Sequence, residues 1–86
     1  FPATLCISVN HEVVHGIPSH RRILAEGDVV SVDCGVKFEG YFSDAAITLP
    51  VGTIAPEVEE LLRVTRTALY RGIEAARAGS RLGDLG

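Results

Sequence analysis

Apolar residues alternate with polar or small residues in two stretches that flank Glu39-Gly40. This two-residue period is typical of β-strands and predicts strands over residues 29–38 and 41–51. Glu39-Gly40 lies where a tight hairpin turn would join them. A shorter alternating stretch predicts a further strand within residues 4–10.

From Pro56 to about residue 77 the apolar residues recur every three or four positions, which predicts one amphipathic helix. Pro56 suits the first helical position, and Gly79 is expected as the C-cap. Glu59 and Arg63 are expected to form an i,i+4 pair. The pattern therefore predicts an α/β chain of the α+β type, with an antiparallel β-hairpin sheet packed by one long amphipathic helix that carries no chemistry.

Composition narrows the class of protein. The 86 residues are 47% hydrophobic and 22% charged, with a formal net charge of −3. This is one domain at most, and the absence of a basic excess argues against a nucleic-acid or anionic membrane surface. No apolar run approaches the roughly 20 residues of a membrane span, and no signal peptide is visible. Cys6 and Cys34 fit no disulfide or zinc spacing, so we expect free thiols and a cytoplasmic location.

The two ends suggest a longer protein. The chain begins at Phe1-Pro2 without an initiator methionine, and a new element starts just before Gly86. We therefore expect residues 1–86 to be a fragment of a single domain.

The alternation assigns each hairpin residue to one of two faces. With a turn of two or four residues, odd-numbered residues of the first strand share a face with even-numbered residues of the second. The apolar face, which we predict to be the core, carries Val30, Val32, Cys34, Val36, Phe38, Tyr41, Ala45, Ile47 and Leu49. The other face carries Asp33 and Asp44, with Cβ atoms within roughly 8 Å of each other.

Two carboxylates this close repel each other unless one is protonated or a cation lies between them. Asp33 and Asp44 are therefore either a solvated pair on an exposed face, an acid/base dyad, or ligands of a divalent metal. Oxygen ligands from two rigid strands suit hard or borderline divalent ions, and two-metal hydrolytic sites use such carboxylates.

His15 is the third candidate for chemistry. Its neighbours are apolar, and Gly16 and Pro18 restrict the backbone beside it, whereas His11 and His20 lie among polar residues and are taken as surface residues. A lone histidine is more often a surface residue than a catalytic one, so both interpretations of His15 stay open at this point.

Several segments, in this order and spacing, resemble type I methionine aminopeptidase. They are Ser8-Val9-Asn10, His15-Gly16-Ile17-Pro18, Glu26-Gly27-Asp28-Val29-Val30, Val32-Asp33-Cys34-Gly35-Val36, Ser43-Asp44-Ala45 and Leu69-Tyr70-Arg71-Gly72-Ile73-Glu74-Ala75. Phe1-Pro2 extends the likeness to the start of the chain. His15 lies 18 positions before Asp33, and Asp44 lies 11 after it, which makes the combination far more specific than any one segment.

The resemblance implies the pita-bread fold, in which two related halves enclose two divalent metal ions (Co, Mn, Fe or Zn). It implies hydrolysis of the first peptide bond of nascent polypeptides by a metal-activated water, which removes the initiator methionine. Asp33 matches the terminal chelating aspartate and Asp44 the aspartate that bridges both metals. His15 matches the histidine that hydrogen-bonds the substrate, and Phe1 and Cys6 match positions that line the methionine side-chain pocket.

The resemblance also implies that several active-site residues of the family are absent from residues 1–86. A ligating histidine, two ligating glutamates and a second substrate-side histidine have no match within residues 1–86, so the fragment alone is expected to be inactive. After Asp44 the family often has a hydroxyl residue and a basic one, where this chain has Ala46 and Ile47. The resemblance raises ribosome association of the full-length protein as a further expectation.

Two alternatives remain. One is an Xaa-Pro aminopeptidase or prolidase of the same fold, although those enzymes usually lack a segment like His15-Gly16-Ile17-Pro18 so soon before the paired aspartates. The other is a non-catalytic binding module on this fold, although such relatives typically lose the aspartates or the histidine.

Overall fold

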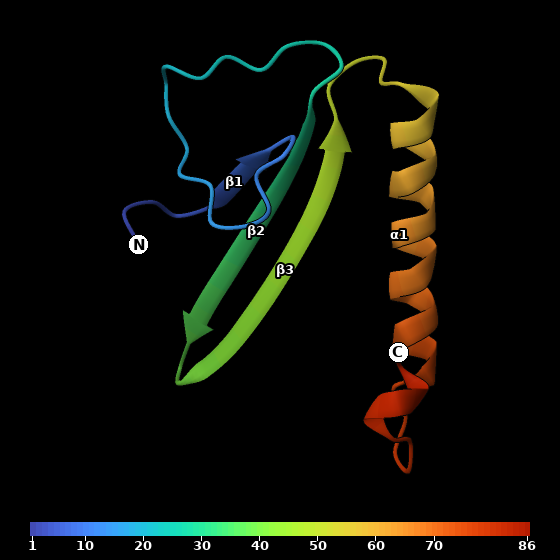
Figure 1. Cartoon of the computed structure of the whole chain (residues 1–86). Helices are drawn as coiled ribbons and strands as arrows, with labels where there is room; N and C mark the ends of the chain where they lie inside the picture. Colours follow the sequence, from blue (N-terminus) through green and yellow to red (C-terminus); the bar gives the residue numbers. More distant parts are fainter. The chain divides into compact units, whose positions relative to one another are not determined.

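The computed structural model describes residues 1–86, which form three antiparallel strands and one long helix (Figure 1). The sheet has the order β1-β2-β3. Its strands are β1 (Cys6–Val9), β2 (Val29–Phe38) and β3 (Tyr41–Pro50), and they precede the helix α1 (Pro56–Ala75) and a short 3₁₀ segment, Leu82–Asp84. The chain divides into two units, Phe1–Ile54 and Ala55–Gly86, and each is described by itself.

The hairpin of β2 and β3 agrees with its prediction to within one residue. The two strands pair along their whole length, from Val29 opposite Pro50 to Phe38 opposite Tyr41. Glu39-Gly40 forms the two-residue turn, with φ angles of 49° and 82°. Left-handed backbone at both positions is the hallmark of the type I′ turn, whose twist matches that of the strands. Gly40 adopts this conformation without steric cost.

The residues predicted to share the apolar face of the hairpin do lie on one face, but the prediction that this face is buried is wrong. Val30 is buried, with 5% of its surface exposed, but Phe38, Tyr41 and Ile47 on the same face are 71%, 81% and 58% exposed. The reason is that the unit Phe1–Ile54 consists of one sheet and loops, with no second layer of secondary structure over this face. Burial is confined to the region beside β1, where Val9 is 3% exposed.

Helix α1 begins at Pro56, as predicted, and ends two residues earlier than expected. The N–H of Ala76 donates to the carbonyl oxygens of Gly72 and Ile73 and caps the helix. The predicted C-cap at Gly79 is therefore wrong; Gly79 has a φ of 91° in the turn that follows.

The predicted pair between Glu59 and Arg63 is also wrong. Arg63 instead binds Glu60, with its Nε 2.9 Å from Oε2 and a second nitrogen 2.5 Å from Oε1. The i,i+3 spacing lets the planar guanidinium meet both carboxylate oxygens, which a single-contact pair cannot match. The predicted packing of α1 against the sheet stays a prediction. No helix has the length and apolar character needed to cross a membrane.

Candidate metal centre

Asp33 and Asp44 lie on the same face of the hairpin. Asp33 is opposite Ala46, and Asp44 is opposite Gly35, so the two aspartates are diagonal neighbours on the ladder. Facing residues of an antiparallel pair project to the same side. Ser31 and Thr48 form the next facing pair on the same side of the hairpin, and their hydroxyls are 3.0 Å apart. The predicted shared face is confirmed.

The two carboxyl groups interact directly. Asp44 raises the pKa of Asp33 above its ordinary value, first through a hydrogen bond between the carboxyls; partial desolvation and charge repulsion add to the effect. The positive charge that His15 can carry acts in the opposite direction, which places its imidazole within electrostatic range of Asp33. Two adjacent carboxylates also form a donor set for a divalent cation, because the cation offsets their mutual repulsion.

The remaining ligands of a complete site are not found in this chain. No three side chains of the His, Cys, Asp or Glu type converge closely enough to hold a metal ion. Asp33 and Asp44 fit a divalent metal by chemistry and placement, but by themselves they would leave most coordination positions to water.

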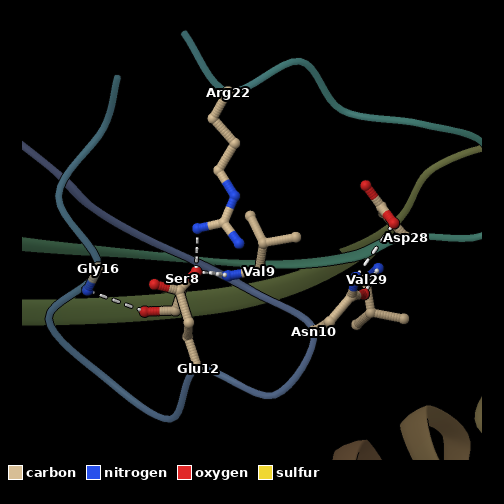
Figure 2. Close-up of polar contacts among 8 residues, drawn as sticks. All are labelled: Ser8, Val9, Asn10, Glu12, Gly16, Arg22, Asp28 and Val29. Atoms are coloured by element: carbon tan, nitrogen blue, oxygen red, sulfur yellow. Dashed lines mark hydrogen bonds and ion pairs between the residues drawn. The ribbon is translucent and has the colours of Figure 1, made fainter. Parts of the chain in front are cut away.

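His15 is positioned by the glycine that follows it. The carbonyl oxygen of Gly16 accepts a 2.8 Å hydrogen bond from the N–H of Ile7. The N–H of Gly16 donates to the Oγ of Ser8 at 3.1 Å (Figure 2). Gly16 is buried, and a Cβ there would lie 2.1 Å from the Ile7 carbonyl oxygen. Only glycine allows this contact, which anchors the left-handed His15 (φ 59°) beside β1.

Asn10, directly after β1, forms hydrogen bonds with residues at the start of β2. Its Oδ1 accepts from the N–H of Val29 at 2.9 Å, and its Nδ2 donates to Asp28 at 3.1 Å (Figure 2). Asp28 also accepts from the N–H of Ala25 at 2.9 Å. The Ala25 bond first, and the Asn10 bond next, lower the pKa of Asp28.

Glu12 closes the loop that carries His15. Its Oε1 accepts from the N–H of Val9 at 3.0 Å and forms an ion pair with Arg22 (Figure 2). The Val9 bond is the largest cause of the lowered pKa of Glu12, and Arg22 adds to it.

The other predicted site residues are placed less closely. Cys6 is directly opposite Asp33 on the β1–β2 ladder, so its thiol is on the face of the aspartates. Cys6 and Cys34 are both free. Phe1 is 68% exposed, and its predicted role in the pocket stays a prediction.

Most of the residues that hold this arrangement in place could not be predicted from the local sequence pattern. Ser8, Asn10, Glu12 and Arg22 were not singled out for their structural contacts. Asn10 was the one with a detectable signal, because an asparagine directly after a strand is suited to left-handed backbone and to bonding neighbouring N–H groups.

Residues 1–86 match the model of metallopeptidase family M24 over their whole length. The methionine aminopeptidase of Clostridium acetobutylicum is 49% identical over 85 residues, which are 99% of this chain and 34% of that protein. The methionine aminopeptidase of Treponema pallidum is 55% identical over 82 residues, 95% of this chain and 32% of that protein.

Solved structures agree. The methionine aminopeptidase of Thermotoga maritima superposes with a TM-score of 0.90 at 47% identity and covers 94% of this chain, and that of Rickettsia prowazekii superposes with 0.89 at 40% and covers 99%. Both neighbours have the pita-bread fold, so the predicted fold class is confirmed. The chain spans about a third of the length of these relatives. The likeness to methionine aminopeptidases is confirmed, and the chain belongs to metallopeptidase family M24.

Proposed function

We propose that residues 1–86 form part of the catalytic domain of a methionine aminopeptidase, which removes the N-terminal methionine from nascent polypeptides. The observation that carries this proposal is the meeting of the Asp33 and Asp44 carboxyls on one sheet face within range of His15. The matching relatives are methionine aminopeptidases, which favours this reaction over a proline-specific peptidase or a non-catalytic module.

Asp33 and Asp44 would hold the metal. The family is one of metallopeptidases, and we propose two divalent ions drawn from Co, Mn, Fe and Zn. By their match to the family's motifs, Asp33 would be the chelating aspartate and Asp44 the bridging one. Gly35, which faces Asp44, leaves open space beside that carboxylate for a ligand. When bound, the metal would supply Lewis acidity and an activated water. The carboxylates orient this chemistry and supply the negative charge that balances the cation.

His15 would act on the substrate. Its imidazole is exposed and near the aspartates, and its backbone is anchored by Gly16, so it can donate a hydrogen bond to the scissile amide from a fixed position. A fixed donor stabilises the negative charge that develops at the peptide group in the transition state.

Cys6 and Phe1 would line the pocket for the methionine side chain. The placement of Cys6 opposite Asp33 supports this role, because a small, apolar, polarisable thiol suits contact with a thioether. For Phe1 the support is the motif match alone.

We also propose a cytoplasmic location and contact with ribosomes. Two free cysteines support a reducing compartment. The proposed substrate, a nascent chain, is the support for ribosome contact, which co-sedimentation of the full-length protein with ribosomes would test.

The proposed reaction is tested with the full-length protein that carries this segment. With added Mn²⁺ it should release methionine from a Met-Ala-Ser peptide and nothing from an Ala-Ala-Ser peptide. Asp44→Asn should lower kcat/KM by roughly 100-fold or more, because it removes the charge of a metal ligand, and even a lost hydrogen bond to such a ligand costs about 10- to 100-fold. Glu39→Gln removes one charge from the turn of the same hairpin and should leave the rate unchanged. Full activity of Asp44→Asn at limiting Mn²⁺ would contradict the proposal.

A further inference from the structure

A second polar feature lies beyond Asp44 on the same face of the hairpin. Lys37 is opposite Phe42, one facing pair nearer the turn than Gly35 and Asp44. The Nζ of Lys37 lies 5.4 Å from the centre of the Phe42 ring, which is a cation–π contact. Lys37 is the only lysine of the chain.

This pair borders an open cavity of about 380 Å³ that begins at Asp44. The cavity is lined by Gly35, Val36, Lys37, Phe42, Ser43 and Asp44. Gly35 adds no side chain to this cavity, and the space beside its Cα is open, with no atom within 4 Å of where a Cβ would lie. The cavity is open to solvent, and Asp44 is the one residue that it shares with the candidate metal centre.

Lys37 is available to bind an anion. The ion pairs of the chain join Arg22 to Glu12, Arg63 to Glu60, and Arg81 to Asp84, and none involves Lys37. Lys37 is exposed and its ammonium is held over the Phe42 ring, although Asp44 is its diagonal neighbour on the ladder.

The distance along the strand from the aspartates to Lys37 determines which substrate residue could contact Lys37. At about 3.4 Å per residue, the Lys37–Phe42 pair lies about 10 Å from the midpoint of Asp33 and Asp44. An extended peptide covers that distance in about three residues. A substrate whose first peptide bond is at the aspartates and which runs along β2 would bring its third or fourth side chain to Lys37.

We propose that Lys37 and Phe42 form a substrate subsite that selects an acidic side chain at the third or fourth residue of the peptide. The ammonium pairs with the carboxylate, and the Phe42 ring contacts the aliphatic part of the same side chain. This inference rests on the proposed aminopeptidase function and adds a substrate preference to it.

The test compares kcat/KM of the full-length, Mn²⁺-loaded protein for methionyl peptides that differ only in one residue. Glu, Gln or Lys is placed at position three, four or six of an otherwise neutral peptide. Glu should exceed Gln about two- to fivefold at position three or four, the range of an exposed ion pair, and should show no advantage at position six. In 1 M salt, where the screening length is about 3 Å, the advantage should disappear.

Two variants distinguish an effect of Lys37 itself from an effect of the protein's overall charge. Lys37→Gln should remove the Glu advantage, and Lys37→Glu should reverse it in favour of the Lys peptide. Arg66→Gln is the matched control, because Arg66 makes a similar cation–π contact with Tyr70 (5.7 Å) on α1 and should leave the ratio unchanged.

An unchanged Glu-to-Gln ratio in Lys37→Gln, with neutral peptides still hydrolysed, would overturn the subsite and leave the proposed function intact. A Glu advantage of equal size at position six would also overturn it. Failure to hydrolyse any methionyl peptide would overturn the proposed function and the subsite together.

Discussion

The N–H of Ile7 donates to the carbonyl oxygen of Gly16, and this one backbone contact seats the His15 loop against strand β1. The contact is possible because Gly16 has no Cβ, which would lie 2.1 Å from the oxygen of Ile7. The position of His15 therefore depends on a glycine rather than on any contact of the imidazole itself.

Gly16→Ala should destabilise the full-length protein by roughly 3 kcal/mol or more, because backbone on both sides must move to admit the methyl group. Urea unfolding followed by circular dichroism would measure this. Gly72→Ala is the control: a Cβ there meets nothing within 4 Å, and alanine in a helix should stabilise by about 1 kcal/mol. Equal stability of Gly16→Ala and the wild type would show that the loop is seated differently.

Asp44→Asn should make the metal-free protein more stable at pH 7. The raised pKa of Asp33 means that the folded state binds its proton more tightly than the unfolded chain, whose aspartate has an ordinary value of 3.8. The stability this provides is present below pH 3.8 and is lost as pH rises through the higher folded pKa. Asp44→Asn removes the main cause of that loss.

The measurement is the difference in urea midpoint between Asp44→Asn and wild type across pH 3–8, with a chelator present. The difference should be small at pH 3 and grow in favour of the variant as pH rises. Glu12 and Asp28, whose lowered pKa values have the opposite effect, are common to both proteins and cancel in the difference. A variant less stable than wild type at pH 7 would contradict the direct contact of the two carboxyls.

Asn10→Asp should weaken the junction of β1 and β2 in a pH-dependent way. Aspartate tolerates the left-handed backbone of Asn10 and can still accept from Val29, but it replaces the donor to Asp28 with a second negative charge. The urea midpoint should fall at pH 7 and recover towards wild type as the pH is lowered and the new carboxylate at position 10 takes up a proton, which removes its repulsion with Asp28. A pH-independent difference would mean that charge at this junction is unimportant.

His15→Ala should lower kcat by roughly 100-fold or more while leaving metal stoichiometry unchanged, since a substrate-side donor acts in the transition state. Steady-state kinetics and titration calorimetry with Mn²⁺ would give the two numbers. Loss of a metal ion in this variant would identify His15 as a ligand instead.

The hairpin was predictable because its signals are local. Alternation over β2 and β3 sets the faces, and Glu39-Gly40 sets the turn, so the common face of Asp33 and Asp44 follows from the sequence. The roles of these aspartates came from the family resemblance, since repulsion alone left three interpretations open.

The failures share a cause, which is dependence on partners outside the local pattern. The exposure of Phe38 and Tyr41 depends on whether a second layer covers the face, which alternation does not encode. The contact between Gly16 and Ile7 joins segments whose approach no period predicts. Arg63 pairs with Glu60 rather than Glu59 because of side-chain geometry within one helical turn, which the periodicity does not encode.

The central claim is that Asp33 and Asp44 hold divalent metal, and metal titration tests it most directly. Calorimetry with Mn²⁺ on the full-length protein should show two ions bound, and Asp33→Asn/Asp44→Asn should lose high-affinity binding while Glu39→Gln keeps it. Residues 1–86 alone should bind weakly, because no three ligating side chains converge in them. Unchanged stoichiometry and affinity in the double variant would contradict the account.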